Sequence, residues 1–325
     1  MLNIPQYMVQ SIYMSYQKIK KTTKTIQWVD IVNPTIEERE QILKEFDFYR
    51  DDIIDAVRQT ARSKMTLRTN YLFLELMVPM YNGDTGFIEV EEIDFLVGKN
   101  FLVTLHHGNH SPVSQTYDTI NGDAKLKNEV LGKGAAYALY SLLDDVLEST
   151  YPMIDHLNED LELLKRKIFL NDNSKETVKQ ILTIRRNITE MRKAMRGHAS
   201  VLEHFLKRKK HLPFSQSTDI EKMFEELIDE ATEIWESLET EKEMIEALED
   251  ANESLIAHRL NTTMKTLTSF SVILLPAGVM ASMWGMNLTE LPFAGNPLDF
   301  WIVLGTMGLV SFTLFLFFWV KQWLK

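Results

Sequence analysis

Two long stretches without charged residues stand out in the pattern of hydrophobic and polar positions. They cover residues 266–284 and residues 300–320. At about 1.5 Å per residue, a helix over either stretch is about as long as the hydrocarbon core of a bilayer is thick. The pattern therefore predicts two transmembrane helices, joined by a short loop over residues 285–299.

The segment before the first span has the spacing of one long amphipathic helix. Apolar residues recur every three or four positions from Ile220 to Leu255, and no proline occurs between Pro213 and Pro276. A helix this long needs a bundle, a coiled coil or a membrane around it. We expect one helix of about 65 residues, which begins near residue 218 and continues into the first span.

The first 134 residues have the mixed pattern of an α/β domain. Short apolar runs predict strands, and one stretch with helical spacing follows the first of them. The strands are expected at residues 26–32, 70–79, 87–97 and 100–105, and the helix at residues 35–48. Helical spacing then dominates residues 135–217, where a turn at residues 171–173 predicts an antiparallel hairpin of helices.

These patterns divide the chain into consecutive segments. The predicted segments are an α/β domain (1–134), a helical hairpin (135–217), an acidic stalk helix (218–265), the first span (266–284), a loop (285–299), the second span (300–321) and a tail (322–325).

Charge is distributed unevenly and agrees with a membrane topology. Basic residues flank the spans at Arg259, Lys265, Lys321 and Lys325, whereas residues 285–299 contain only acidic charges. This bias predicts that both termini lie in the cytoplasm of a cell, at its inner or plasma membrane. The first residues lack the pattern of a secretory signal, and the absence of cysteine fits a reducing compartment.

The acidic charge is concentrated in the predicted stalk. Residues 219–260 contain 15 acidic and 3 basic residues, whereas residues 161–211 contain 14 Lys or Arg and 5 acidic residues. We expect Arg185, Arg186, Arg192 and Arg196 of the basic segment to form salt bridges with acidic helices. The acidic net charge of −11 argues against nucleic-acid binding, and no motif of an enzyme is present.

The loop after the first span carries the motif Gly285-Met286-Asn287, preceded by Trp284. With its position between two C-terminal spans, the motif resembles that of the CorA family of divalent-cation channels. The resemblance implies an α+β fold, in which a stalk helix continues into the first of two transmembrane helices, and a funnel-shaped homopentamer. It also implies transport of Mg²⁺, with Co²⁺ or Ni²⁺ as further cargo, without an organic cofactor. The implied partners are other copies of the chain, membrane lipid and divalent cations.

The first span also has a stripe of small and polar residues at helical spacing. It comprises Met264, Thr268, Ser271, Leu275, Gly278 and Ser282. Such a stripe is typical of packing between membrane helices, and beside the motif it also predicts the lining of a pore. By resemblance, Asn261 matches a polar pore entrance, and Met264 and Leu267 match a hydrophobic constriction. Gly285, Met286 and Asn287 would form the selectivity filter, in which five Asn287 carbonyls contact a hydrated ion.

Acidic residues provide candidates for regulation by cytoplasmic Mg²⁺. In a ring of subunits, carboxylates of neighbouring chains would repel one another unless cations bridge them. Glu226 and Asp229 are the candidates on the stalk, and Glu89 and Glu91 are candidates from the N-terminal domain, where Glu92 and Asp94 are also near in sequence. The alternative is a solvated charged face.

Other interpretations of the sequence remain open. His106, His107 and His110 follow a predicted strand but lack companions at the spacing of zinc ligands. A family member that transports Zn²⁺ is one alternative function. A membrane-anchored coiled-coil scaffold without transport is another.

Overall fold

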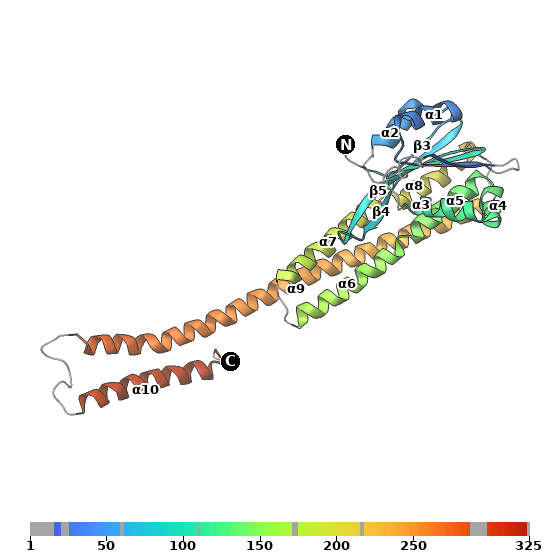
Figure 1. Ribbon diagram of the computed structural model, residues 1–325. Coiled ribbons are helices and arrows are strands. Elements are labelled where there is room, and N and C mark those ends of the chain that lie inside the picture. Colours follow the sequence, from blue (N-terminus) through green and yellow to red (C-terminus); the bar gives the residue numbers. More distant parts are fainter. Residues whose placement is uncertain are drawn as a thin grey trace, which may run out of the picture. The chain divides into compact units, whose positions relative to one another are not determined.

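The computed structural model describes residues 16–20, 26–58, 62–108, 111–170, 175–214, 218–286 and 298–323 (Figure 1). Contacts within the chain divide it into two units, Met1–Ala247 and Leu248–Lys325. Helix α9 (Thr218–Trp284) contributes its first part to one unit and its second part to the other. Its 67 residues agree with the predicted single helix.

The first unit is built on a six-stranded sheet with the order β1-β2-β6-β5-β4-β3. The strands are β1 (Tyr16–Lys20), β2 (Gln27–Val32), β3 (Lys64–Leu67), β4 (Tyr71–Asn82), β5 (Phe87–Gly98) and β6 (Phe101–His106). Only the β2–β6 pair is parallel among these five pairings. The sequence predicts β2, β4, β5 and β6 but misses β1 and β3, which lie at the two edges and have too few apolar residues for a clear pattern.

Two helices, α1 (Ile36–Phe46) and α2 (Arg50–Arg58), cover one face of the sheet (Figure 1). A capping box begins α1, because the Thr35 side chain accepts from the Glu38 backbone while the Glu38 carboxylate accepts from the Thr35 backbone. Ile42, Phe48 and Ile53 pack with Tyr71 and other apolar residues of the sheet. This packing places a dry, apolar layer over that face.

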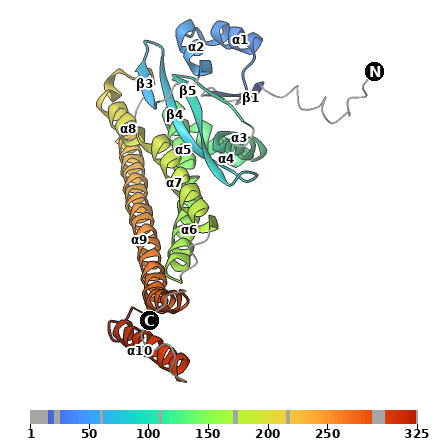
Figure 2. The ribbon, with the colours of Figure 1, turned by 90° about the vertical axis from the view of Figure 1, so that its left-hand side faces the viewer.

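Further helices cover the opposite face of the sheet (Figures 1 and 2). They are α3 (Pro112–Gly122), α4 (Ala124–Gly132), α5 (Ala135–Glu148), α6 (Tyr151–Phe169), α7 (Lys175–Met195) and α8 (His198–Lys207), of which α5, α7 and α8 contact strands directly. The predicted hairpin is present as α6 and α7, which pack against each other.

The structure divides each arm of the predicted hairpin into two helices. The first arm breaks between Glu148 and Tyr151, where the Thr150 hydroxyl donates to the carbonyl of Leu147. The second arm breaks at Gly197, where an added Cβ would lie 3.0 Å from the Cβ of Ser63. A glycine at this break lets the helices approach the start of β3 closely.

The second unit contains the last part of α9 and helix α10 (Asp299–Val320). The Ser311 hydroxyl of α10 lies 3.5 Å from the carbonyl oxygen of Ile273 in α9. The stretches Asp219–Trp284 and Phe300–Val320 each contain a window long and apolar enough to cross a membrane. The predicted spans therefore fall on helices, as the absence of charge requires.

Candidate functional site

The two helices of the second unit contact each other along one side of α9. Ser269 is fully buried there, and Ile273 is 9% exposed. Thr266, Pro276 and Met280 are half-buried at positions three or four residues apart. This periodicity shows that a single stripe of α9 faces α10.

The predicted pore-lining stripe lies on the other side of the same helix. At about 100° per residue, Met264, Ser271, Leu275 and Ser282 lie roughly 160–180° around the helix from Ile273. Every residue of the stripe is exposed, as are Asn261 and Leu267. The second unit therefore leaves the small and polar side of α9 uncovered by its own chain.

The hydroxyl groups along this part of α9 are bonded within the helix. Ser271 donates to the carbonyl of Leu267 at 2.9 Å, and Thr262 donates to the carbonyl of His258 at 3.0 Å. Because these donors are satisfied locally, the hydroxyl oxygens can still accept hydrogen bonds from water. The exposed stripe thus offers acceptors to a hydrated cation.

Large apolar side chains occupy two positions of the same stripe. Met264 is 55% exposed and Leu275 is 70% exposed, and the neighbouring Leu267 is 61% exposed. In a soluble monomer such residues would be in contact with water at a cost of about 1.5–3 kcal/mol each. Their exposure in a single chain calls for lipid or further copies around this helix.

The predicted selectivity motif begins where α9 ends. The Gly285 amide donates to the carbonyl of Ala281 at 3.0 Å, and Met286 is 53% exposed. Asn287 lies outside the described residues. The structure therefore places two of the three motif residues at the end of the first span.

One of the two acidic candidates on the stalk, Glu226, lies near other carboxylates of the first unit. Glu226 and Asp229 are exposed on α9. Burial, together with the charges of Asp144 and Glu148, raises the pKa of the neighbouring Glu230 to about 7. Burial and then nearby carboxylates, including Glu226, also raise the pKa of Asp144 on α5. Sequence reasoning missed Asp144 and Glu148, because only the fold brings α5 beside α9.

The acidic candidates on β5 separate into two groups. Alternation along the strand directs Glu89 and Glu91 to one face and Glu92 and Asp94 to the other. Glu89 is exposed and accepts a hydrogen bond from the Asn82 amide at 3.0 Å. Glu91 lies beside Gly108, where an added Cβ would be 2.7 Å from its Oε1. The four carboxylates therefore do not form one cluster.

Two of the three histidines considered for zinc lie at the end of β6, and His110 lies outside the described residues. His106 is 2% exposed, and its Nε2 is 3.3 Å from Asp30 Oδ1 and 3.1 Å from Ser114 Oγ. Burial lowers the pKa of His107. Because a single ring nitrogen of His106 contacts both Asp30 and Ser114, the arrangement is not a nucleophile–base–acid relay.

Of the four arginines predicted to pair with acidic helices, Arg192 does so. The Arg192 guanidinium forms an ion pair with Glu239 of α9 and lies 5.2 Å from the ring centre of Trp235. Lys209 forms a second ion pair, with Glu221. Arg186 instead lies over the ring of Phe87. The contacts of Arg192 and Lys209 join the basic segment to the first part of α9.

An α/β domain and two membrane-length apolar helices, one of them with an uncovered polar stripe, define a class of membrane transport protein. Residues 23–322 match the family described as "CorA-like Mg2+ transporter protein". The chain belongs to the CorA family. Members of this family are divalent-cation transporters and not enzymes.

Relatives with experimental or curated descriptions agree with this assignment. The "Cobalt/magnesium transport protein CorA" of Thermotoga maritima is 23% identical over 83% of this chain and 75% of its own length. The protein of the same name from Methanocaldococcus jannaschii is 24% identical over 87% of this chain and 86% of its own length. The solved structure of the CorA magnesium transporter from the latter organism matches with a TM-score of 0.78, at 21% identity over 92% of each chain. This match shows that the fold is shared.

Proposed function

We propose that this chain forms a homopentameric channel for the uptake of Mg²⁺ across a cell membrane. The observation that carries the proposal is the exposed stripe of α9, which lies opposite the side covered by α10. Five copies around an axis would bring these stripes together and line a pore. The apolar residues that flank the stripe, including Phe270 and Leu274, would then face lipid or neighbouring helices.

In this proposal Asn287 selects the ion at the outer end of the pore. Mg²⁺ releases its tightly held waters reluctantly, so a ring of amide oxygens can recognise the hydrated ion through those waters. Both termini would be cytoplasmic, which places the motif on the opposite side of the membrane. An inside-negative potential contributes about 2.3 kcal/mol per charge per 100 mV, and roughly twice that for a divalent cation. Nucleotide hydrolysis is not needed.

The gate of the proposed channel is apolar. Met264 and Leu267 lie about one turn apart and are both exposed in the single chain. Rings of such side chains can exclude water from a narrow pore and so stop ions without binding them. Widening of the rings would restore a hydrated path.

The proposed control is binding of cytoplasmic Mg²⁺ between neighbouring chains. Glu226 and Asp229 would provide one half of each site, and Glu89 or Glu91 of the next chain the other half. The raised pKa of Glu230 and of Asp144 supports the idea that carboxylates are crowded near this part of α9. Bound Mg²⁺ would offset the repulsion and stabilise the closed state, so falling Mg²⁺ would favour opening.

Flux into proteoliposomes tests the proposed selectivity. We expect Asn287→Ala to lower Mg²⁺ uptake at least about tenfold, as expected for loss of ion contacts worth about 1.4 kcal/mol or more. Asn296→Ala, in the same loop, is the matched control and should keep its flux. Equal uptake by the wild type and Asn287→Ala would refute the assignment. Competition by Zn²⁺, Co²⁺ and Ni²⁺ in the same assay distinguishes a Mg²⁺ channel from a Zn²⁺ transporter.

A second flux measurement separates the channel from a scaffold without transport. Met264→Ser should make the constriction easier to hydrate and so raise uptake when the inner solution already contains millimolar Mg²⁺. Leu274→Ser, which lies off the stripe, is the control. A scaffold predicts no flux from any of these proteins.

Protease resistance tests the regulatory sites separately. Millimolar Mg²⁺ should protect the first unit of the wild type, and the Glu226→Gln/Asp229→Asn double variant should lose this protection. The Glu243→Gln variant, with an exposed carboxylate on the same helix, should keep it. Protection of the double variant to the same degree would exclude these two residues as ligands.

A further inference from the structure

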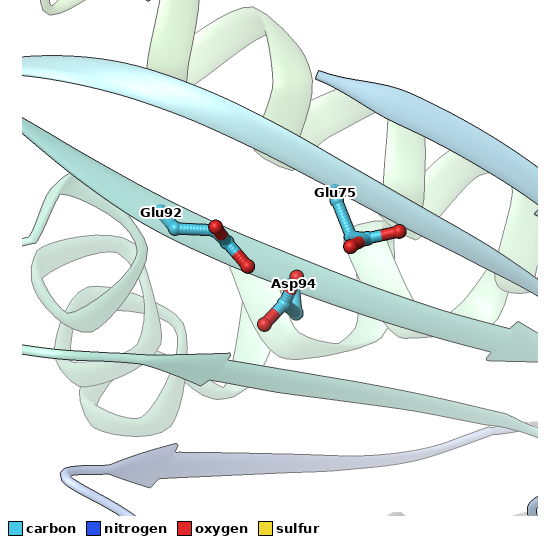
Figure 3. Close-up of side chains that lie close together, drawn as sticks. All are labelled: Glu75, Glu92 and Asp94. Atoms are coloured by element: carbon cyan, nitrogen blue, oxygen red, sulfur yellow. The ribbon is translucent and has the colours of Figure 1, made fainter. Parts of the chain in front are cut away.

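Three buried carboxyl groups meet on one face of the sheet of the first unit. Glu75 lies on β4, opposite Asp94 of β5, and Glu92 lies two residues from Asp94 on the same face. Their exposed fractions are 0%, 2% and 1%, respectively, for Glu75, Glu92 and Asp94. Figure 3 shows the three carboxyl groups close together across the two strands. One oxygen atom from each residue lies within 4.8 Å of the others.

The triad, Glu75, Glu92 and Asp94, lies beside the apolar cluster of the sheet. Tyr71 and Phe73 precede Glu75 on the same face of β4, and both belong to the apolar cluster beneath α1 and α2. The triad therefore adjoins a mostly apolar layer, in which the buried Asp52 accepts hydrogen bonds from Tyr71 and Arg68. Burying three carboxylates beside such a layer is unfavourable unless something neutralises them.

One cation of the chain lies beside the triad. Lys64 Nζ is 3.0 Å from Glu75 Oε1 and 3.3 Å from Asp55 Oδ2. The Lys64 and Asp55 side chains are 39% and 45% exposed, so this pair marks the side of the triad nearest to solvent. This ammonium group is thus shared between Glu75 and Asp55.

Asp94 presents one oxygen atom to the triad that has no hydrogen-bond donor among the described residues. This atom, Oδ1, is buried. Burial, followed by the charges of Glu92 and Glu75, raises the pKa of Asp94 well above its usual range. A buried carboxyl group that lies beside two others and has an oxygen atom without a donor offers a ligand position to a cation.

We propose that Glu75, Glu92 and Asp94 bind one hard divalent cation within a single chain. The ligand atoms are all carboxylate oxygens, which suit Mg²⁺, Mn²⁺ or Ca²⁺ rather than thiophilic metals. Two oxygen ligands of one ion lie at most twice the metal–oxygen distance apart, which is about 4.2 Å for Mg²⁺ and about 4.6–5.2 Å for Ca²⁺. The limit of 4.8 Å between the triad's oxygen atoms is at the upper end of this range. A divalent cation would offset two of the negative charges of the triad. The site would tie β4 to β5, and it does not depend on the proposed pore or on contacts between chains.

Counting bound Mn²⁺ in the full-length, detergent-solubilised protein tests this site. Electron paramagnetic resonance of free Mn²⁺ gives the number bound per chain. We expect Asp94→Asn to bind one Mn²⁺ per chain fewer than the wild type, whereas Glu37→Gln, an exposed position on α1, should bind the same number. Ions at the pore or between chains contribute equally to all three proteins, so failure of the proposed function would leave this difference intact.

A second variant protects the test against misfolding. Lys64→Met removes the ammonium group that competes for Glu75, and we expect it to tighten Mn²⁺ binding at this site by roughly tenfold. A loss of folding cannot produce tighter binding. If Asp94→Asn and Lys64→Met both match the wild type in Mn²⁺ number and affinity, the triad holds protons rather than a metal, and the proposal is wrong.

Discussion

The two parts of α9 follow the same helical period but differ in how far their apolar residues are buried. Up to Ala247, apolar residues such as Phe224, Leu227 and Leu238 are at most 1% exposed, and most charged residues face outward. From residue 266 onward the helix has no charge, and its apolar residues, such as Leu274 at 66%, are largely exposed. The apolar residues of the first part are thus covered by the same chain, whereas most of those in the second part are not.

This difference shows how one helix can be adapted to two solvents. In water, a helix is held by burying one apolar stripe against its neighbours. In lipid, apolar side chains need no such cover, and small or polar residues instead mark where helices or ions approach. The uncovered stripe of α9 is therefore the part of the chain whose role depends most on other copies.

The largest expected effect on stability comes from the packed part of α9. Phe224 is fully buried and stacks on Phe205 of α8, with ring centres 4.1 Å apart. Phe224→Ala should lower the free energy of unfolding of this region by about 3–5 kcal/mol, because it leaves a cavity. Denaturant-dependent hydrogen exchange of α9 amides in the solubilised protein measures the change.

Leu274→Ala is the matched test in the second part of α9. It should change the same quantity by less than about 1 kcal/mol if its side chain meets only lipid or detergent. A loss of unfolding free energy as large as that for Phe224→Ala would show that Leu274 is buried between copies. The two parts of α9 would then not differ in the burial of their apolar residues.

A smaller effect, of opposite sign, is expected at Glu241. Its side chain is 2% exposed, and neither carboxylate oxygen accepts a hydrogen bond from a residue that the structure describes. Burial raises the pKa of Glu241 from 4.5 to about 7. The folded chain therefore binds a proton more tightly than the unfolded chain, and stability falls as the pH rises through this window.

Glu241→Gln should remove this loss of stability. Above about pH 7 the variant should be more stable than the wild type by about 3 kcal/mol, and the gain should disappear below about pH 4.5. Glu243→Gln, at an exposed position on the same helix, should show no such pH dependence. If the two variants behave alike, Glu241 is solvated or paired in the assembly, and the first part of α9 does not bury an unpaired carboxyl group.

Much of this architecture can be predicted from the sequence because periodicity is local. The four internal strands and the long helix follow from spacing alone, and the positions Phe224, Leu227 and Leu238 are buried as that spacing requires. The edge strands β1 and β3 have no such signal. The two helical arms break at Thr150 and at Gly197, where Gly197 approaches Ser63. The positions of these breaks depend on contacts in the folded chain that spacing does not reveal.

The candidate sites are also predictable only in part from the sequence. Alternation along β5 could have separated Glu91 from Glu92, because successive strand residues point to opposite faces. The addition of Glu75 could not be foreseen, since it depends on the register of β4 against β5. The helical spacing of the stripe on α9 was predictable from the sequence. In the structure α10 covers the opposite side of α9. The closure of the stripe into a ring depends on other copies, which one sequence does not specify.

The smallest expected effect concerns the ion pair that joins α7 to the first part of α9. Arg192 pairs with Glu239 and lies over Trp235, and its side chain is 25% exposed. Arg192→Ala should cost about 1–2 kcal/mol, because the pair is partly screened but the ring contact adds to it. Lys193→Ala, which breaks only an exposed pair with Glu190 on α7, should cost less than about 0.5 kcal/mol in the same exchange measurement. Equal costs would mean that the overall charge of α7, and not the specific contact of Arg192, holds α9 in place. The first part of α9 would then depend less on specific contacts within its own chain than its burial indicates.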